Sequence, residues 1–118
     1  LGECDDIVSF FCNLDILVSC SFEESFGLVI AEAMACRTLC VVTNTGMSST
    51  IVGNTGIIVP INDRESLHNG ILKLIRLDER KRLKLSNLAR KRILKMFDIN
   101  KMTTDYQNLY LEILRKRL

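Results

Sequence analysis

Short apolar runs alternate with amphipathic stretches along the first half of this chain. Ile16–Val18, Leu39–Thr43 and Ile57–Val59 are largely apolar runs of strand length, each followed by polar residues or a proline. Such runs predict strands, and we expect those at Ile16–Val18 and Leu39–Thr43 to be buried on both faces. Residues 4–13 place apolar side chains at helical spacing, and Phe26–Cys36 is rich in Ala, Leu and Met, so both are predicted helices. The alternation predicts an α/β fold class with a parallel sheet flanked by helices.

The second half of the chain predicts three further helices, over residues 63–76, 79–96 and 101–116. Asn62, with Glu65 three residues later, resembles a capping box that opens the first of them. The apolar faces of the three helices are expected to be Leu67, Ile71, Leu74 and Ile75; then Leu83, Leu88 and Ala89; then Met102, Tyr106, Leu109, Ile113 and Leu114.

Composition excludes several classes of protein. With 118 residues, 47% hydrophobic and 25% charged, the chain suits one folded domain and neither a disordered nor a fibrous protein. No apolar run approaches the roughly 18 residues of a membrane-spanning helix. Glu3, Asp5 and Asp6 stand where a signal peptide carries cations. A cytoplasmic protein is expected.

The cysteines do not form a metal-binding pattern. They are Cys4, Cys12, Cys20, Cys36 and Cys40, and none belongs to a C-x-x-C pair. A structural zinc site needs tighter clustering of its ligands, so no metal is expected. Each cysteine stands in an apolar context, which predicts reduced, buried thiols and not a disulfide framework. His68, the single histidine, is expected on the exposed side of its helix.

Charge is distributed unevenly between the two halves. Residues 1–60 carry one basic residue against seven acidic ones, whereas residues 61–118 carry fifteen against seven. The basic helices are either solvated faces or a surface attracted to anionic lipids, with peripheral contact at the cytoplasmic face of a membrane. Nucleic acid is not expected as a partner, because Phe97, Tyr106 and Tyr110 are interpreted as core residues and form no stacking platform.

Candidate chemistry follows the first predicted strand, in Phe22–Gly27. Ligands of open parallel sheets bind beyond the carboxyl ends of the strands, and the N-terminus of the next helix favours an anion. Gly27 lets a ligand approach the backbone closely. Glu24 and Glu32, with seven residues between them, could hold two hydroxyl-bearing parts of one ligand, as in a nucleotide-sugar. The alternative from spacing alone is that Glu24 is an early-turn helix acid and Glu32 a solvated helix residue.

At these residues the sequence resembles a known family. Glu24–Ala35 (ESFGLVIAEAMA) is similar to the E-x7-E signature of retaining GT-B glycosyltransferases of group 1. Gly53–Gly56 and Val59-Pro60 resemble the family's following G..G.LV segment, and Asp63 its next helix start. The resemblance implies a Rossmann-like parallel sheet flanked by helices, as the later part of the C-terminal, donor-binding lobe of a GT-B fold, with C-terminal helices.

The resemblance also implies a site and a reaction. Glu24 would be the catalytic residue and contact the hydroxyls of the donor sugar, Glu32 would hold the ribose, and backbone amides from Gly27 to Val29 would meet the diphosphate. The substrate-binding residues it implies are Glu24, Ser25, Phe26, Gly27, Leu28, Val29 and Glu32. The donor would be a UDP-, GDP- or ADP-hexose in polysaccharide or glycoconjugate synthesis, transferred with retention to an acceptor hydroxyl. Neither a cofactor nor a metal is implied.

Four residues depart from the family pattern. Arg37 replaces a glycine just past the helix and would cost about 1 kcal/mol if its backbone is left-handed. Leu39 replaces a proline in a strand, which should be harmless. Met47 replaces the second glycine of a loop near the donor, and Thr50 replaces a glutamate at the cleft rim.

The chain is expected to be a partial domain, 1–118, that lacks the N-terminal acceptor lobe. The cations that a leaving diphosphate needs come, in the family, from a segment upstream of the residues seen here. The isolated chain is therefore expected to be inactive without the missing lobe or a partner chain. The alternative is a non-catalytic remnant whose basic helices adhere to anionic membranes.

Overall fold

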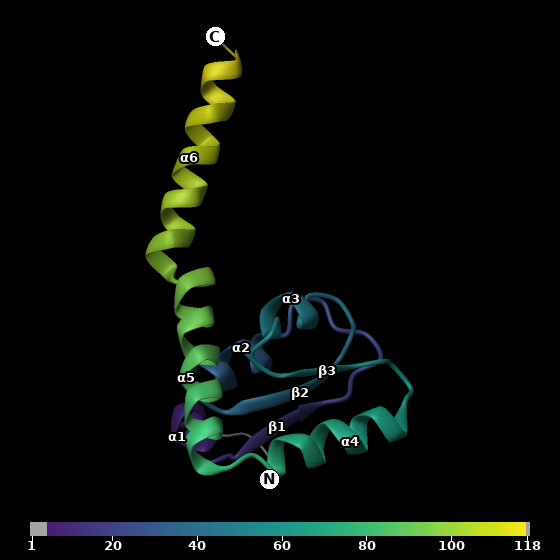
Figure 1. The fold of residues 1–118 in the computed structure, drawn as a ribbon. Helices are drawn as coiled ribbons and strands as arrows, with labels where there is room; N and C mark the ends of the chain where they lie inside the picture. Colours follow the sequence, from purple (N-terminus) through teal and green to yellow (C-terminus); the bar gives the residue numbers. More distant parts are fainter. Residues whose placement is uncertain (1–4, 118) are drawn as a thin grey trace.

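The computed structural model describes residues 5–117, and in this part of the chain three strands form one parallel sheet (Figure 1). The strands are β1 (Ile16–Ser19), β2 (Leu39–Thr43) and β3 (Ile57–Val59), in the order β1-β2-β3. Ile16 pairs with Leu39, and Val41 pairs with Ile57. The predicted parallel α/β architecture is confirmed, and the bounds of β2 and β3 are those expected from the sequence.

Burial differs among the strands. Every residue of β2 is buried, as predicted for a strand covered on both faces. In β1, however, Val18 is 39% exposed, so the expectation that this strand is buried on both faces was wrong. The reason is that β1 is an edge strand of the described sheet. The helix over residues Arg64–Ile75, which covers one face of the sheet, packs mainly against β2 and β3.

Helices cover both faces of the sheet. One face carries α1 (Ile7–Cys12), α2 (Leu28–Ala35), α3 (Ser48–Val52) and α5 (Glu79–Met96), and the other carries α4 (Arg64–Ile75) (Figure 1). The buried side chains accordingly form two clusters, one on each face of β2. The first includes Phe11, Ile30, Met34, Val42, Ile51 and Ile93, and the second includes Leu39, Val41, Val59 and Leu74.

The sequence pattern missed α3 because this five-residue helix is too short to show a period. Its start is held by Ser48, whose hydroxyl donates to the carbonyl of Thr43 at 2.7 Å and to that of Thr45 at 2.6 Å. The hydroxyl in turn accepts from the Thr45 N–H at 3.1 Å. The buried side chain of Ser48 thus stabilises the turn between the end of β2 and the start of α3.

The start of α4 differs in detail from the expected capping box. Asp63, and not Asn62, is the N-cap residue, and its carboxylate accepts from the Ser66 N–H at 2.9 Å. Asn62 has a φ of 58°, a left-handed conformation that asparagine tolerates better than most residues. Ile75, expected on the apolar face of α4, is 54% exposed because it lies in the last turn.

The buried face of α5 also differs from the prediction. Leu83 and Leu88 were expected inside but are 58% and 46% exposed, whereas Ser86, Ala89 and Ile93 are buried. This face packs against α2, and small side chains allow two helices to approach closely. The choice of face therefore follows from the neighbouring helix and not from the hydrophobicity of α5 itself.

Helix α6 (Ile99–Arg117) projects away from the rest of the molecule along the direction of α5 (Figure 1), and none of its residues is buried. Tyr106 and Tyr110 are 55% and 60% exposed, so their interpretation as core residues was wrong. Phe97, at the end of α5, does pack inward, with its ring 5.4 Å from that of Phe26. The apolar stripe of α6 is therefore exposed along the described helix.

The expectation of buried thiols holds for only one of the cysteines in residues 5–117. Cys40, in β2, is buried, and desolvation raises the pKa of its thiol to about 12. Cys12 and Cys20 are exposed and Cys36 is half-buried, because they lie at the ends of helices and strands. Cys4 lies outside the described residues.

Candidate functional site

The connections that follow β1 and β2 lie at the carboxyl edge of the sheet and are hydrogen-bonded to each other. The Thr43 hydroxyl donates to the carbonyl of Ser21 at 2.6 Å, and the Thr45 hydroxyl donates to that of Phe22 at 3.3 Å. The Met47 N–H donates to the carbonyl of Ser25 at 3.3 Å. The candidate segment Phe22–Gly27 is thereby held in place by the loop after β2.

Gly46 allows the two loops to touch. It has a φ of 50°, and a Cβ at this position would lie 1.6 Å from the carbonyl oxygen of Glu24. No larger residue fits without moving the loop that carries Glu24. Gly46 therefore positions the loop that carries Glu24, the first candidate carboxylate.

The N-terminus of α2 is open at this edge. Gly27 is its N-cap residue, with left-handed φ and ψ of 90° and 50°, and no side chain caps the helix. The N–H groups of Ile30 and Ala31 donate to the Gly27 carbonyl, at 3.0 and 3.2 Å. The N–H groups of Leu28 and Val29, in the first turn, have no carbonyl of the helix as an acceptor. Phe26 and Gly27, predicted to be helical, lie just before the helix, so a stretch of free amides faces the site.

Glu24 and Glu32 flank this helix start. Glu24 is half-buried in the loop, and its Cγ lies 3.6 Å from where a Gly27 Cβ would be. Glu32 lies within α2 and is exposed. Among residues 5–117, neither carboxylate takes part in an ion pair or a side-chain hydrogen bond. Both are therefore available to a ligand, although the exposure of Glu32 also fits a solvated helix residue.

Apolar side chains surround the open helix start. Those that are more than one-third exposed are Phe22 at 69%, Leu28 at 65%, Val29 at 53% and Met47 at 37%. Ser25 is exposed as well. Beyond this rim, a hollow of about 570 Å³ lies along the carboxyl ends of the strands, lined by Cys20, Phe22, Thr43, Pro60, Asn62, Asp63, Arg64 and Leu67. The edge of the sheet thus has room for a ligand or a covering element.

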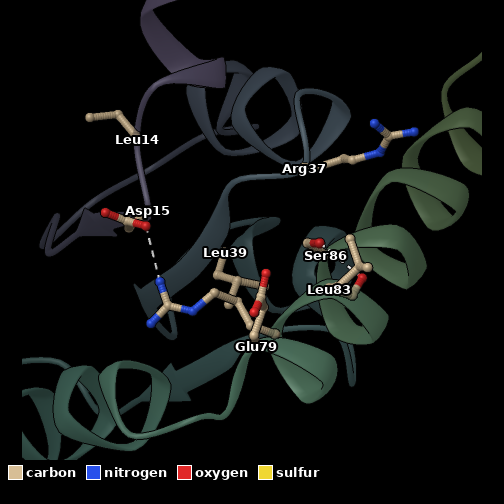
Figure 2. Close-up of a pocket in the computed structure, with 8 residues that line it drawn as sticks. Leu14, Asp15, Arg37, Leu39, Glu79, Leu83 and Ser86 are labelled. Atoms are coloured by element: carbon tan, nitrogen blue, oxygen red, sulfur yellow. Dashed lines mark hydrogen bonds and ion pairs between the residues drawn. The ribbon is translucent and has the colours of Figure 1, made fainter.

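A second hollow, of about 230 Å³, lies at the opposite edge, between the amino ends of the strands and the start of α5 (Figure 2). Asp15 accepts a hydrogen bond there from Arg82 at 3.0 Å, drawn as the dashed line in Figure 2. Arg37 also lines this hollow, with its side chain directed away from Asp15. Because the hollow is remote from Gly27, its ion pair belongs to the fold and not to the candidate chemistry.

Three arginines of α5 have a structural role that the sequence did not reveal. Arg82, Arg90 and Arg92 each donate to carbonyl groups at the C-terminal end of another helix, where a cation is favoured. Arg92 donates from Nε at 2.8 Å and from Nη2 at 2.6 Å. The acceptors are Leu74 and Ile75 at the end of α4, Ala35 at the end of α2, and Thr50 and Ile51 in α3. These arginines serve the fold, and the alternative of a membrane-adhering basic surface gains no support from them.

Two further observations concern residues 5–117 only. No helix there combines the length and hydrophobicity that crossing a bilayer requires. No three acidic, cysteine or histidine side chains are grouped so that they could hold a metal ion.

Comparison with known proteins adds family information. Residues 1–92 match the sequence profile of "Glycosyl transferases group 1". The chain is 29% identical over 117 residues to the N-acetyl-alpha-D-glucosaminyl L-malate synthase of Bacillus anthracis, covering 98% of this chain and 30% of that protein. It is 33% identical over 113 residues to the capsular polysaccharide biosynthesis glycosyltransferase CapM of Staphylococcus aureus, covering 94% and 30%. The chain thus spans about 30% of the length of these relatives.

Solved structures share the fold. A glycosyltransferase from Rickettsia africae superposes with a TM-score of 0.88 at 30% identity, over 97% of this chain and 31% of that one. The sucrose-phosphate synthase of Thermosynechococcus elongatus superposes with a TM-score of 0.85 at 26% identity, over 98% and 30%.

Proposed function

Because this chain belongs to the group 1 glycosyltransferases, we propose that it forms the donor-binding part of an enzyme that transfers a hexose from a nucleotide-sugar to an acceptor hydroxyl. Its fold is that of part of a GT-B glycosyltransferase. The donor is a UDP-, GDP- or ADP-hexose, and the anomeric configuration is retained.

The observation that carries the proposal is the uncapped N-terminus of α2 at the carboxyl edge of the parallel sheet. Gly27 has a left-handed backbone conformation, and the N–H groups of Leu28 and Val29 that follow it make no hydrogen bond within the helix. Negative charge grows on the diphosphate as it leaves the sugar, and preorganised N–H donors together with the helix dipole stabilise it. This is where interactions lower the barrier most.

The two carboxylates are assigned to the two ends of the donor. Glu24, half-buried beside Gly27, accepts hydrogen bonds from hydroxyls of the sugar. Glu32, inside α2, accepts from the ribose hydroxyls. In the reaction the acceptor hydroxyl oxygen bonds to the anomeric carbon, the bond from that carbon to the diphosphate oxygen breaks, and the hydroxyl proton passes to the departing diphosphate. The transition state has oxocarbenium character.

The rest of the enzyme is assigned to sequence outside this chain. The relatives are about three times as long as this chain. The N-terminal lobe of the enzyme would bind the acceptor and supply cations to the diphosphate. The exposed apolar residues of α6 support a covering partner, since a stripe of this kind on a solvated helix otherwise has no stabilising role. The reaction is proposed to need no metal.

An NMR titration of the isotope-labelled chain with UDP, GDP, ADP and their glucose conjugates tests the proposal. Binding at the assigned site would shift signals of residues 22–32 and of the loop at 46–50, and would identify the nucleotide. Added EDTA should leave the shifts unchanged.

Matched variants make the test specific. Glu32→Gln should weaken nucleotide binding about tenfold, as loss of a charged hydrogen-bond acceptor does, without changing the melting temperature. Glu112→Gln, at an exposed glutamate of α6, should change neither. If Glu32→Gln lowers the melting temperature and leaves binding intact, the assigned role of Glu32 is wrong.

A further inference from the structure

The hollow of about 570 Å³ along the carboxyl ends of the strands has chemistry that the assignment of the donor does not use. Its volume lies within the roughly 300–1,000 Å³ that is usual for small-molecule sites. Three consecutive polar residues, Asn62, Asp63 and Arg64, line it at the start of α4, and Phe22 lines it from the loop after β1. An aromatic ring and a set of hydrogen-bonding side chains therefore share one cavity.

The loops around this hollow are held in place before any ligand binds. The Thr45 hydroxyl donates to the carbonyl of Phe22 at 3.3 Å, which joins the loop after β2 to the loop after β1. The Asn44 N–H donates to the carbonyl of Val59 at 2.8 Å, which joins the loop after β2 to the end of β3. A site whose walls are already fixed loses little conformational entropy when a ligand binds.

The polar side chains of the hollow offer both donors and acceptors. The Asp63 carboxylate accepts from the N–H and the hydroxyl of Ser66, at 2.9 and 2.6 Å, and each oxygen keeps a lone pair for a further donor. Arg64 is exposed and makes no ion pair within residues 5–117, so its N–H groups are available. The amide of Asn62 adds two donors and an acceptor. Because one carboxylate and one guanidinium balance each other, the hollow favours a neutral ligand with several hydroxyls over an anion or a cation.

The side chain of Phe22 adds a stacking surface to these polar groups. Phe22 is 69% exposed. The face of a phenyl ring is electron-rich and attracts the slightly positive C–H groups on the face of a sugar ring. The hydroxyls at the edge of the same sugar can then bond to the polar side chains. A linear polyol has no such C–H face, so the combination favours a pyranose.

We propose that this hollow is a subsite for a neutral sugar unit of the acceptor, with Phe22 against the C–H face of that sugar and residues 62–64 bonded to its hydroxyls. The inference rests on the proposed function, because an acceptor needs a donor beside it. Phe22 precedes Glu24, which is assigned to the donor sugar, by two residues, whereas Glu32, assigned to the ribose, lies further along inside α2. The hollow therefore adjoins the sugar end of the donor, where the acceptor hydroxyl attacks.

An NMR titration of the isotope-labelled 118-residue chain with maltose, lactose, N-acetylglucosamine, glycerol and inorganic phosphate tests the proposal. Glycerol presents hydroxyls without a ring, and phosphate presents an anion. At least one of the sugars should shift the signals of Phe22 and of residues 62–67, and neither glycerol nor phosphate should do so at the same concentration. The proposal is overturned if no sugar shifts these signals up to its solubility limit, or if phosphate shifts them instead.

Matched variants show which side chains bind the sugar. Phe22→Ala should weaken sugar binding about tenfold, whereas Phe22→Tyr, which keeps the ring, should retain it. Arg64→Ala should also weaken binding, whereas Arg76→Ala, at the other end of α4, should not. Unchanged binding in Phe22→Ala, or equal losses in the two arginine variants, would contradict the proposal. The titration of the unsubstituted chain decides the outcome even where a variant fails to fold.

Nucleotides separate a failure of this inference from a failure of the proposed function. The sugar should still bind when the chain is saturated with a nucleotide-sugar, because the two sites are distinct. If the nucleotide-sugar displaces the sugar, or if a nucleotide alone shifts residues 62–67, the hollow belongs to the donor, and this inference fails while the proposed function stands. If no nucleotide binds at residues 22–32, the proposed function fails, and the acceptor role of the hollow fails with it.

Discussion

Arg37 occupies a backbone conformation that favours glycine, and its replacement by glycine should stabilise the chain. Its φ is 67°, in the left-handed region, just past the end of α2. The Arg37 N–H donates to the carbonyl of Met34 at 3.0 Å, and the Thr38 N–H donates to that of Ala33 at 2.9 Å. This pair of bonds is the Schellman motif, whose left-handed position is usually glycine.

The size of the effect follows from two opposing terms. A residue with a Cβ in the left-handed region costs roughly 1–2 kcal/mol, which Arg37→Gly recovers. Glycine makes the unfolded chain freer, which costs about 0.4–1 kcal/mol. The Arg37 side chain is exposed and makes no hydrogen bond or ion pair within residues 5–117, so little else is lost. The net gain should be about 1 kcal/mol, or roughly 4 °C in melting temperature for a chain of this size.

Thermal and urea unfolding of Arg37→Gly, compared with Arg37→Ala, would measure this gain. Alanine removes the same side chain and charge but keeps the Cβ, so it should stay within about 0.5 kcal/mol of the parent. If alanine stabilises as much as glycine, the gain comes from the side chain and not from the backbone. If glycine gives no gain, the assigned strain does not exist.

Two further predictions concern the helix ends. Arg92→Ala should lower the free energy of unfolding by about 1–3 kcal/mol, because two charge-assisted hydrogen bonds to α3 are lost. Lys91→Ala, on the exposed face of α5, should change the free energy of urea unfolding by less than about 0.5 kcal/mol. Equal effects of the two substitutions would contradict the capping role of Arg92. The N-cap carboxylates accept hydrogen bonds from residues three positions later, which lower their pKa below the ordinary value of 3.8; they are Asp6, Asp63 and Asp78. A carboxyl whose pKa is lower in the folded state adds stability above its unfolded pKa and loses it as the pH falls through the folded one. Urea unfolding from about pH 6 to about pH 2 should therefore lose stability at the acid end, and the triple Asp→Asn variant should lose less of it. An unchanged acid dependence in that variant would contradict the assignment.

Local sequence predicted best those structural features that depend on a single physical requirement. Residues 39–43 could be placed as a strand because a strand covered on both faces needs a nearly uninterrupted apolar run, and residues 57–59 because a short apolar run ends there at Pro60. The left-handed backbone at Arg37 was raised as a possibility by the resemblance, because the family has a glycine at that position. The location of the candidate site followed from the rule that parallel strands end at one edge, with a helix N-terminus beside it.

Other features depended on which parts of the chain meet. The buried face of α5 is set by close packing against α2, so Leu83 and Leu88 are exposed although they are large apolar residues. The sequence showed the basic character of α5 but not that Arg90 and Arg92 reach the ends of helices about 40 to 55 positions earlier.

The sequence by itself determined the order of the strands and of the longer helices, the parallel α/β class and the segment that carries the candidate site, because these rest on local periodicity and on chain connectivity. The tertiary structure decided which side chains meet. It placed Gly46 against the carbonyl of Glu24, the guanidinium of Arg92 against carbonyls of α3, and the apolar stripe of α6 in solvent. Contacts of this kind depend on the relative position of segments far apart in the chain, and no local pattern encodes that position.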